Sequence, residues 1–118
     1  MNIQAIFRSL IDFFEKQKID YALVGAFALK AYGYLRATED VDFLVRGACQ
    51  GKIVAYLESL GYETIHRSAG YSNHVHPLAK LGRIDFLYVE GETADTLLSE
   101  ARPLLLIDAR TVPVVRAE

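Results

Sequence analysis

The sequence predicts one domain of mixed α and β structure, with a mixed β-sheet flanked by helices. Segments with the apolar spacing of amphipathic helices alternate with short apolar runs that are typical of buried strands. In the second half, two strand-like segments flank a glycine-containing turn, which indicates a β-hairpin. This order favours an α/β or α+β sandwich. The 118 residues suffice for one domain and leave no room for a second core.

The composition is that of a globular protein, with 52% hydrophobic and 24% charged residues. No apolar run approaches the ~20 residues that span a bilayer, and the N-terminus lacks the pattern of a secretory signal. A single cysteine, Cys49, excludes an internal disulfide and a cysteine-based zinc site. We therefore expect a cytoplasmic protein with no membrane partner. The net charge of −2 argues against a broad, non-specific nucleic-acid surface but not against a nucleotide substrate.

The first third of the chain contains two predicted helices and two predicted strands. Apolar residues at spacings of three and four predict an amphipathic helix that reaches about Gln17. These residues are Ile3, Ile6, Phe7, Leu10 and Phe14. Residues 21–24 are expected to form a short apolar strand, and the alanine-rich residues 26–32 a short helix that ends at Gly33. Residues 40–45 predict a second strand.

The same patterns continue to the end of the chain. They predict a helix at 53–60 that Gly61 terminates, strands at 62–65 and 73–78, a turn at 79–82, a strand at 83–89, a helix at 94–101, and strands at 104–107 and 111–115. Pro113 has no amide hydrogen, so we expect the last strand to be an edge strand or irregular. The chain stops directly after an apolar run, which indicates either a missing C-terminal part or a short natural protein.

The most informative motif is an acidic pair in the predicted strand at 40–45. Successive side chains of a strand point to opposite faces, so Asp40 and Asp42 share one face. Val41, Phe43 and Val45 point to the other face, toward a core. Two neighbouring carboxylates repel each other unless a cation lies between them, and Mg²⁺ prefers one or two carboxylates plus phosphate oxygens. The alternative is a solvated face, because so short a motif is common by chance.

A third aspartate lies in the strand at 83–89. The apolar residues that share one face of this strand are Ile84, Phe86 and Tyr88. Asp85 lies on the other face with Leu87, and an isolated carboxylate in an apolar strand is costly unless it is paired or bound to a metal. The alternative is a salt bridge, to Arg83 or Lys80. If this strand lies beside the strand with the acidic pair, the three carboxylates converge and can hold two divalent ions.

The candidate nucleotide ligands precede the acidic strand; they are Gly25, Ala26, Arg36 and Thr38. Gly25-Ala26 follows a strand and precedes a helix, where a glycine and the helix amides allow a close approach to phosphate. The alternative is a glycine that serves only the backbone turn. Arg36 and Thr38 could contact phosphate or ribose; their alternative roles are a surface arginine and a threonine that caps a turn.

Taken in order, these motifs resemble the DNA polymerase β-like nucleotidyltransferase superfamily. Its members carry a Gly-Gly or Gly-Ser pair, a short helix, an Asp-hydrophobic-Asp strand, and a third aspartate on another strand. Gly25-Ala26, Asp40-Val41-Asp42 and Asp85 take these three places. The string is most similar to the minimal bacterial and archaeal branch, which includes the nucleotidyltransferase toxins of abortive-infection systems. The resemblance covers about residues 21–115 and implies a polymerase β-like core.

The resemblance also implies an activity. A nucleoside monophosphate would pass from a nucleoside triphosphate (NTP) to an acceptor hydroxyl on a protein, an RNA or a small molecule. Two Mg²⁺ or Mn²⁺ ions would take part, with Asp40 and Asp42 bound to both. Asp85 would bind one ion and help to deprotonate the hydroxyl. Gly25 and the amide of Ala26 would cradle the β- and γ-phosphates.

Two departures from the family pattern leave a second function open. Ala26 stands where the family has glycine or serine, so no hydroxyl is available there for a phosphate. Many members also continue into a helical region that binds the acceptor, and this chain has none. The alternative is a catalytically degenerate nucleotide-binding or protein-interaction module of a toxin–antitoxin-like system, with a partner protein or a second copy as its partner.

Two histidines complete the set of candidates. His74 and His76 alternate on a predicted strand and therefore share a face. They form a potential pair of metal ligands, but a third ligand is missing from the pattern. We expect them instead to line the cleft or to face solvent.

Overall fold

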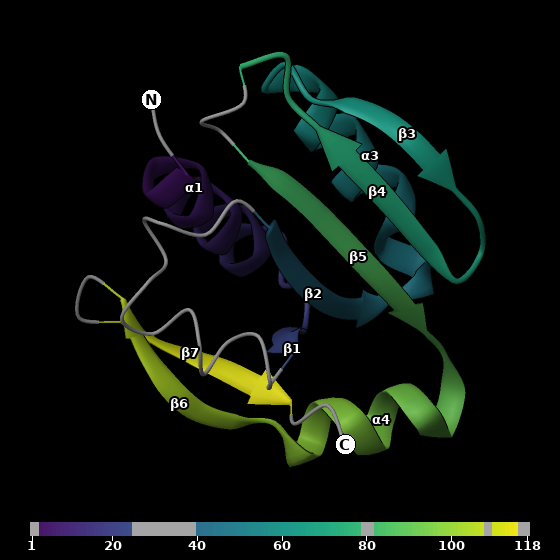
Figure 1. Cartoon of the computed structure of the whole chain (residues 1–118). Coiled ribbons are helices and arrows are strands. Elements are labelled where there is room, and N and C mark those ends of the chain that lie inside the picture. Colours follow the sequence, from purple (N-terminus) through teal and green to yellow (C-terminus); the bar gives the residue numbers. More distant parts are fainter. Residues whose placement is uncertain (1–2, 25–39, 79–81, 108–109, 116–118) are drawn as a thin grey trace.

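The chain folds around one seven-stranded mixed sheet with helices packed against it (Figure 1), which confirms the predicted α+β class. The structure is a computed structural model that describes residues 3–24, 40–78, 82–107 and 110–115. The strand order is β3-β4-β5-β2-β1-β7-β6. The strands are β1 (Tyr21–Val24), β2 (Asp40–Arg46), β3 (Glu63–Arg67), β4 (Tyr71–Val75), β5 (Arg83–Val89), β6 (Arg102–Ile107) and β7 (Arg110–Val115). The pairs β2/β5 and β1/β7 are parallel, and the other neighbours are antiparallel.

Helices α1 (Ile3–Lys16) and α3 (Gln50–Ser59) lie on one face of the sheet, and α4 (Gly91–Glu100) lies near its β7 side (Figure 1). The buried side chains of α1 follow the predicted helical spacing; they are Ile6, Phe7, Leu10, Ile11 and Phe14. None of the helices in the described ranges is long and apolar enough to cross a membrane. Within the described residues, α1 and α3 therefore cover the face of the sheet that carries the large aromatic core.

Phe43 of β2 lies at the centre of the core. Its ring stacks on Phe86 of β5, with centroids 5.4 Å apart, and on Phe7 of α1 at 5.7 Å. Phe14 meets it edge-on at 5.3 Å. Such aromatic pairs add about 0.5–1.5 kcal/mol each to the effect of area burial. These contacts fix β2 and β5 relative to α1, and therefore fix the residues on the other face of both strands.

The end of α3 is determined by Gly61, as the sequence predicts. This residue has φ = +94°, a conformation that strains a side chain. A Cβ atom here would also lie 2.7 Å from Nε2 of His76. His76 Nε2 lies 3.1 Å from the carbonyl oxygen of Leu60 and donates a hydrogen bond to it. His76 therefore closes the end of a helix, rather than lining a cleft.

The prediction for His74 was also wrong, because this side chain is completely buried between the sheet and α3. Its Nδ1 lies 3.0 Å from Oγ1 of Thr64, and its Nε2 lies 2.7 Å from Oγ of Ser72. Ser72 in turn lies 2.6 Å from the hydroxyl of Tyr88. Both ring nitrogens are thus occupied within the core. In a continuous strand, His74 and His76 would point to the same face. Strand β4, however, ends at Val75, before His76.

The burial of His74 makes the stability of the fold depend on pH. Desolvation lowers the pKa of His74 to about 4, against the opposing charges of Asp85 and Glu58. The unfolded chain, with a histidine pKa of about 6.5, binds a proton that the folded chain rejects. This contribution to the free energy of unfolding is complete above pH 6.5 and is lost as the pH falls toward 4.

We expect the difference in unfolding free energy between wild type and His74→Gln to shrink by about 3 kcal/mol from pH 7 to pH 4. Urea denaturation of both proteins at several pH values measures this difference, and titrations shared by both proteins cancel in it. A difference that stays constant across the range would contradict a neutral, buried His74.

Two strand predictions need correction. Strand β4 ends three residues earlier than its predicted end at Leu78. Pro113 does not lie in an edge strand, because β7 is placed between β1 and β6, and β6 is the edge. Pro113 instead pairs with Pro103 of β6, next to a register shift between Pro103 and Leu105. The missing amide hydrogens therefore fall at an irregular part of the ladder, where proline is tolerated.

Candidate active site

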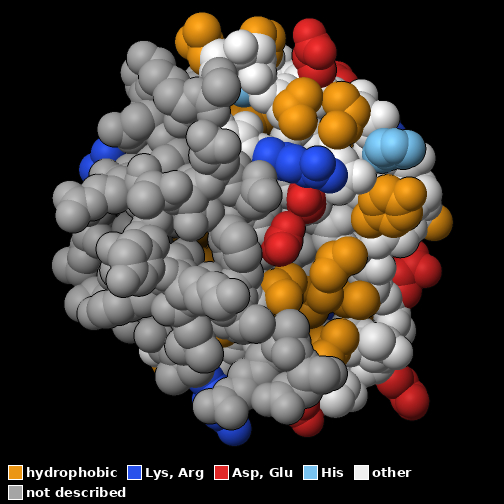
Figure 2. Space-filling model, viewed as in Figure 1, with side chains coloured by type: hydrophobic (Ala, Val, Ile, Leu, Met, Phe, Trp, Pro, Cys, Tyr) orange, Lys and Arg blue, Asp and Glu red, His pale blue; other side chains and the backbone are white. Residues whose placement is uncertain are grey.

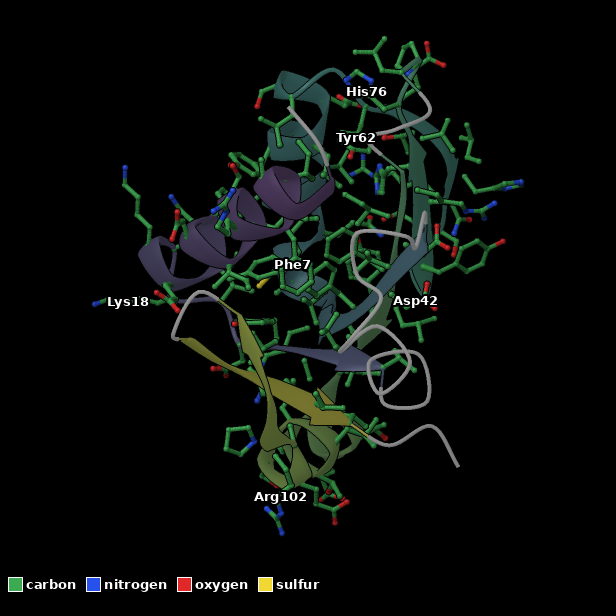
Figure 3. The ribbon with its side chains drawn as sticks, turned by 60° about the vertical axis from the view of Figure 1, so that its left-hand side comes forward. Phe7, Lys18, Asp42, Tyr62, His76 and Arg102 are labelled. Atoms are coloured by element: carbon green, nitrogen blue, oxygen red, sulfur yellow. The ribbon has the colours of Figure 1, made fainter. Side chains whose placement is uncertain are left out.

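Strands β2 and β5 bring Asp42 and Asp85 side by side. The two strands are parallel, and their register pairs Asp42 directly with Asp85. Adjacent strands lie ~4.8 Å apart, so the two carboxylates start from neighbouring positions. The alternating neighbours of both residues are buried in the core: Val41, Phe43 and Val45 in β2, and Ile84, Phe86 and Tyr88 in β5. Both aspartates consequently lie on the face away from α1, as Figure 3 shows for Asp42 and Phe7.

The two acidic strands are therefore adjacent, which was the condition for their carboxylates to converge. Asp40 is the first residue of β2, and its register partner is Arg83. Its side chain is outside the described part of the structure. The predicted nucleotide ligands Gly25, Ala26, Arg36 and Thr38 lie outside the described residues, as does Lys80. Their roles stay predictions.

The carboxylate of Asp85 is held by two neighbours on the same face. Arg83 Nε donates to Oδ1 at 3.0 Å and to Oδ2 at 3.2 Å. The salt bridge weighed as the alternative role of Asp85 thus exists, with Arg83 as its partner. Asn73 of β4 donates its amide to Oδ1 at 2.8 Å. The sequence analysis did not identify Asn73, although it stands directly opposite Asp85 in the β4/β5 ladder.

Apolar side chains border the acidic pair on this face (Figure 2). Tyr71 of β4 and Leu87 of β5 are register partners, and 43% and 45% of their surfaces are exposed. Leu87 follows Asp85 by two residues, so both point to the same face. Large apolar side chains exposed next to charged groups are typical of ligand-binding surfaces.

The donor chemistry of the pair suits a hard divalent ion. Mg²⁺ is commonly bound by one or two carboxylates, with waters or phosphate oxygens as its remaining ligands. Within the described side chains, no group of three or more His, Cys, Asp or Glu residues is placed to hold a metal. Asp42 and Asp85 alone supply a two-carboxylate donor set, to which the position of Asp40 in the same strand adds a third candidate.

Asn73→Ala is expected to weaken Mn²⁺ binding by about tenfold. Asn73 fixes Oδ1 of Asp85, and a hydrogen bond to a charged group contributes ~1.5–3 kcal/mol. Calorimetric titration of Mn²⁺ in the presence of an NTP measures the affinity, with Thr93→Ala on the exposed surface of α4 as the control. An unchanged affinity would show that Asn73 does not position Asp85 for a metal.

A cavity of about 470 Å³ lies elsewhere, between the start of β1 and α4. Arg46 in its wall donates to Asp95 at 2.9 Å and lies 3.6 Å from Asp20. The hydrogen bond with Asp95 is the main cause of the raised pKa of Arg46. Arg46 is thus already bound by both aspartates of this wall, whereas the carboxylates of the other face are direct register partners, so the Asp42–Asp85 face is the better candidate.

The fold and its paired acidic strands define the class of structure: this is the fold of the polymerase β-like nucleotidyltransferases. The antibiotic-resistance factor ANT(2'')-Ia matches with a TM-score of 0.71 and 15% identity, over 95% of this chain and 64% of that one. The lincosamide antibiotic adenylyltransferase LnuA, solved with lincomycin bound, matches with a TM-score of 0.63 and 16% identity, over 92% of this chain and 77% of that one.

At these identities the likeness establishes the fold alone, and the chain spans less than two thirds of ANT(2'')-Ia. No protein-family model matches the sequence, and no curated protein matches it either.

Proposed function

We propose that the protein is a metal-dependent nucleotidyltransferase that moves a nucleoside monophosphate from an NTP to an acceptor hydroxyl. The observation that carries the proposal is the direct register pairing of Asp42 and Asp85 on the face of the sheet away from α1. The same overall fold occurs in an enzyme whose name states adenylyl transfer, LnuA. Two carboxylates on adjacent strands form a donor set that suits a divalent ion.

In the proposed reaction, the acceptor oxygen forms a bond to the α-phosphorus, and the bond from that phosphorus to pyrophosphate breaks. The hydroxyl proton leaves toward Asp85. Two divalent ions, Mg²⁺ or Mn²⁺, would neutralise the phosphates and the departing pyrophosphate. Asp40 and Asp42 would hold both ions and Asp85 one of them, with Gly25 and the amide of Ala26 on the β- and γ-phosphates. Arg36 and Thr38 would contact phosphate or ribose.

We favour a small molecule with an apolar part as the acceptor, over a protein or an RNA. Tyr71 and Leu87 expose apolar surface directly beside Asp85. An RNA would require a basic surface, whereas the cation described beside the acidic pair, Arg83, is bonded to Asp85. The overall charge of −2 points the same way.

The degenerate binding module is the second candidate, because Ala26 replaces the family's glycine or serine. In that case the protein would bind a metal and an NTP without transferring the nucleotide. A role in a toxin–antitoxin-like pair, with a partner protein or a second copy, belongs to this candidate.

Thermal unfolding with Mg²⁺ or Mn²⁺ and each of the four NTPs tests both candidates. Either candidate predicts stabilisation by metal plus NTP beyond that by either alone. Only the enzyme also transfers nucleotide labelled at the α-phosphate to a hydroxyl compound. If no combination of metal and NTP raises the unfolding temperature, the nucleotide site is absent and both candidates fail.

A further inference from the structure

Arg83 places a guanidinium inside the carboxylate site. It precedes Asp85 by two residues in β5, so both side chains lie on the same face. Its Nε contacts both carboxylate oxygens of Asp85, at 3.0 and 3.2 Å. Across the β2/β5 ladder, the register partner of Arg83 is Asp40. The four positions Asp40, Asp42, Arg83 and Asp85 thus form a compact square on two neighbouring strands.

This arrangement makes Arg83 and a metal competitors for the same oxygens. A divalent ion bound to Asp85 would use lone pairs that the guanidinium now occupies, and the two cations would repel each other. Without a metal, by contrast, the guanidinium offsets the repulsion between Asp85 and its neighbour Asp42. The charge of Arg83 therefore favours the metal-free site.

Asp85 has two hydrogen-bond partners, Arg83 and Asn73. Their exposure and chemistry indicate that Arg83 is the one that moves. The side chain of Arg83 is long and 43% exposed, while that of Asp85 is 22% exposed. An ion pair whose arginine is exposed to water contributes little to stability and can open more readily than a buried one. Asn73 is short, its bond to Oδ1 is partly buried, and an amide is neutral toward a metal. Asn73 can therefore keep Oδ1 in place while Arg83 withdraws.

We propose that Arg83 is the resident counter-ion of the active site: it neutralises Asp85 in the metal-free protein and is displaced when divalent ions bind. The part of this inference that concerns metal binding rests on the proposed function. Arg83 is a positioning residue, which acts on the reaction through the metal affinity of Asp85. It lowers the negative charge of the acidic face until a metal binds with its nucleotide.

Removing the charge of Arg83 is expected to tighten metal binding. In Arg83→Gln, the side chain keeps a hydrogen-bond donor but has no charge, and Mn²⁺ should bind about 3- to 10-fold more tightly in the presence of an NTP. Arg83→Lys, which restores the positive charge, should bind within about twofold of wild type. Arg102→Gln removes the same charge far from Asp42 (Figure 3) and should change nothing. Calorimetric titration measures all four proteins.

A second readout follows Arg83 itself. On titration of the wild type with diamagnetic Mg²⁺ and an NTP, the Nε–H resonance of Arg83 should move to the position of an unbonded arginine. Equal or weaker Mn²⁺ binding by Arg83→Gln, or an unmoved Nε–H resonance at saturating metal, would overturn the inference and leave the proposed function standing. Absence of Mn²⁺ binding in the wild type and in every variant would overturn both.

Discussion

Replacing Asp42 with asparagine is expected to lower the rate of nucleotidyl transfer by about 10³-fold or more. Asp42 is the register partner of Asp85. The change removes the negative charge with which Asp42 would bind the metal ion that also binds the substrate. Loss of one preorganised electrostatic contact at a reacting centre costs ~10²–10³ in rate, and a metal ligand is at the upper end or beyond. Transfer of nucleotide labelled at the α-phosphate measures the effect.

The matched control is Asp12→Asn, which makes the same change of charge on the exposed side of α1. It should keep the wild-type rate. The unfolding temperature of Asp42→Asn without metal should stay close to that of wild type, because its core neighbours are unchanged. An Asp42→Asn protein that is folded and retains more than a tenth of the wild-type rate would exclude Asp42 as a metal ligand.

Replacing Phe43 with alanine should have the largest effect on stability, a loss of about 3–5 kcal/mol in the free energy of unfolding. The ring is fully buried and contacts Phe7, Phe14 and Phe86. A domain of this size is stable by only ~5–15 kcal/mol, so a large part of the total would be lost. Urea denaturation followed by circular dichroism measures the change.

Phe13→Ala is the control for this prediction, because Phe13 is only partly buried and stacks on Tyr56 at the helix surface. Its loss should be clearly smaller. Equal losses at Phe13 and Phe43 would mean that the rings joining α1, β2 and β5 are not the centre of the core. The connection to function is direct, since Phe43 follows Asp42 in β2.

The sequence was sufficient to predict the acidic face, because that prediction depends on local alternation. Val41 and Phe43 are buried and Asp42 is not, as a period of two requires. The same holds for Asp85 between Ile84 and Phe86. The adjacency of β2 and β5 could not be derived in this way, because the two strands are separated by α3 and a hairpin. The sequence therefore left it as a condition, which the observed register of the two strands meets.

The contact between Asn73 and Asp85 could not be predicted, because hairpin register is decided by more than turn residues. A four-residue turn at 79–82 would pair Leu78 with Arg83 and place His76 opposite Asp85. The observed register pairs Val75 with Arg83, which brings Asn73 opposite Asp85. The register differs by three residues, and a shift by any odd number of residues exchanges the faces of a strand. It also explains why His74 lies in the core.

Of the two alternatives predicted for Pro113, the irregular segment agrees with the structure and the edge strand failed, for a similar reason. A proline in the sequence shows that an amide hydrogen is missing at that position. It does not show which strands flank the strand that contains it. Strand β7 is covered by β6, which follows α4 in the chain, and the prolines of the two strands share an irregular part of the ladder. Long-range pairing, rather than local preference, settled both this strand and the hairpin.

The central claim is that a metal–nucleotide complex binds on the Asp42–Asp85 face. Its most direct test is paramagnetic line broadening, with Mn²⁺ and a non-hydrolysable NTP titrated into the ¹⁵N-labelled protein. We expect the amide signals of β2 and β5 around Asp42 and Asp85 to broaden first, and those of Arg102 and Tyr56 to stay sharp. Early broadening around Arg46 and Asp95 instead, or no selective broadening at all, would contradict the claim.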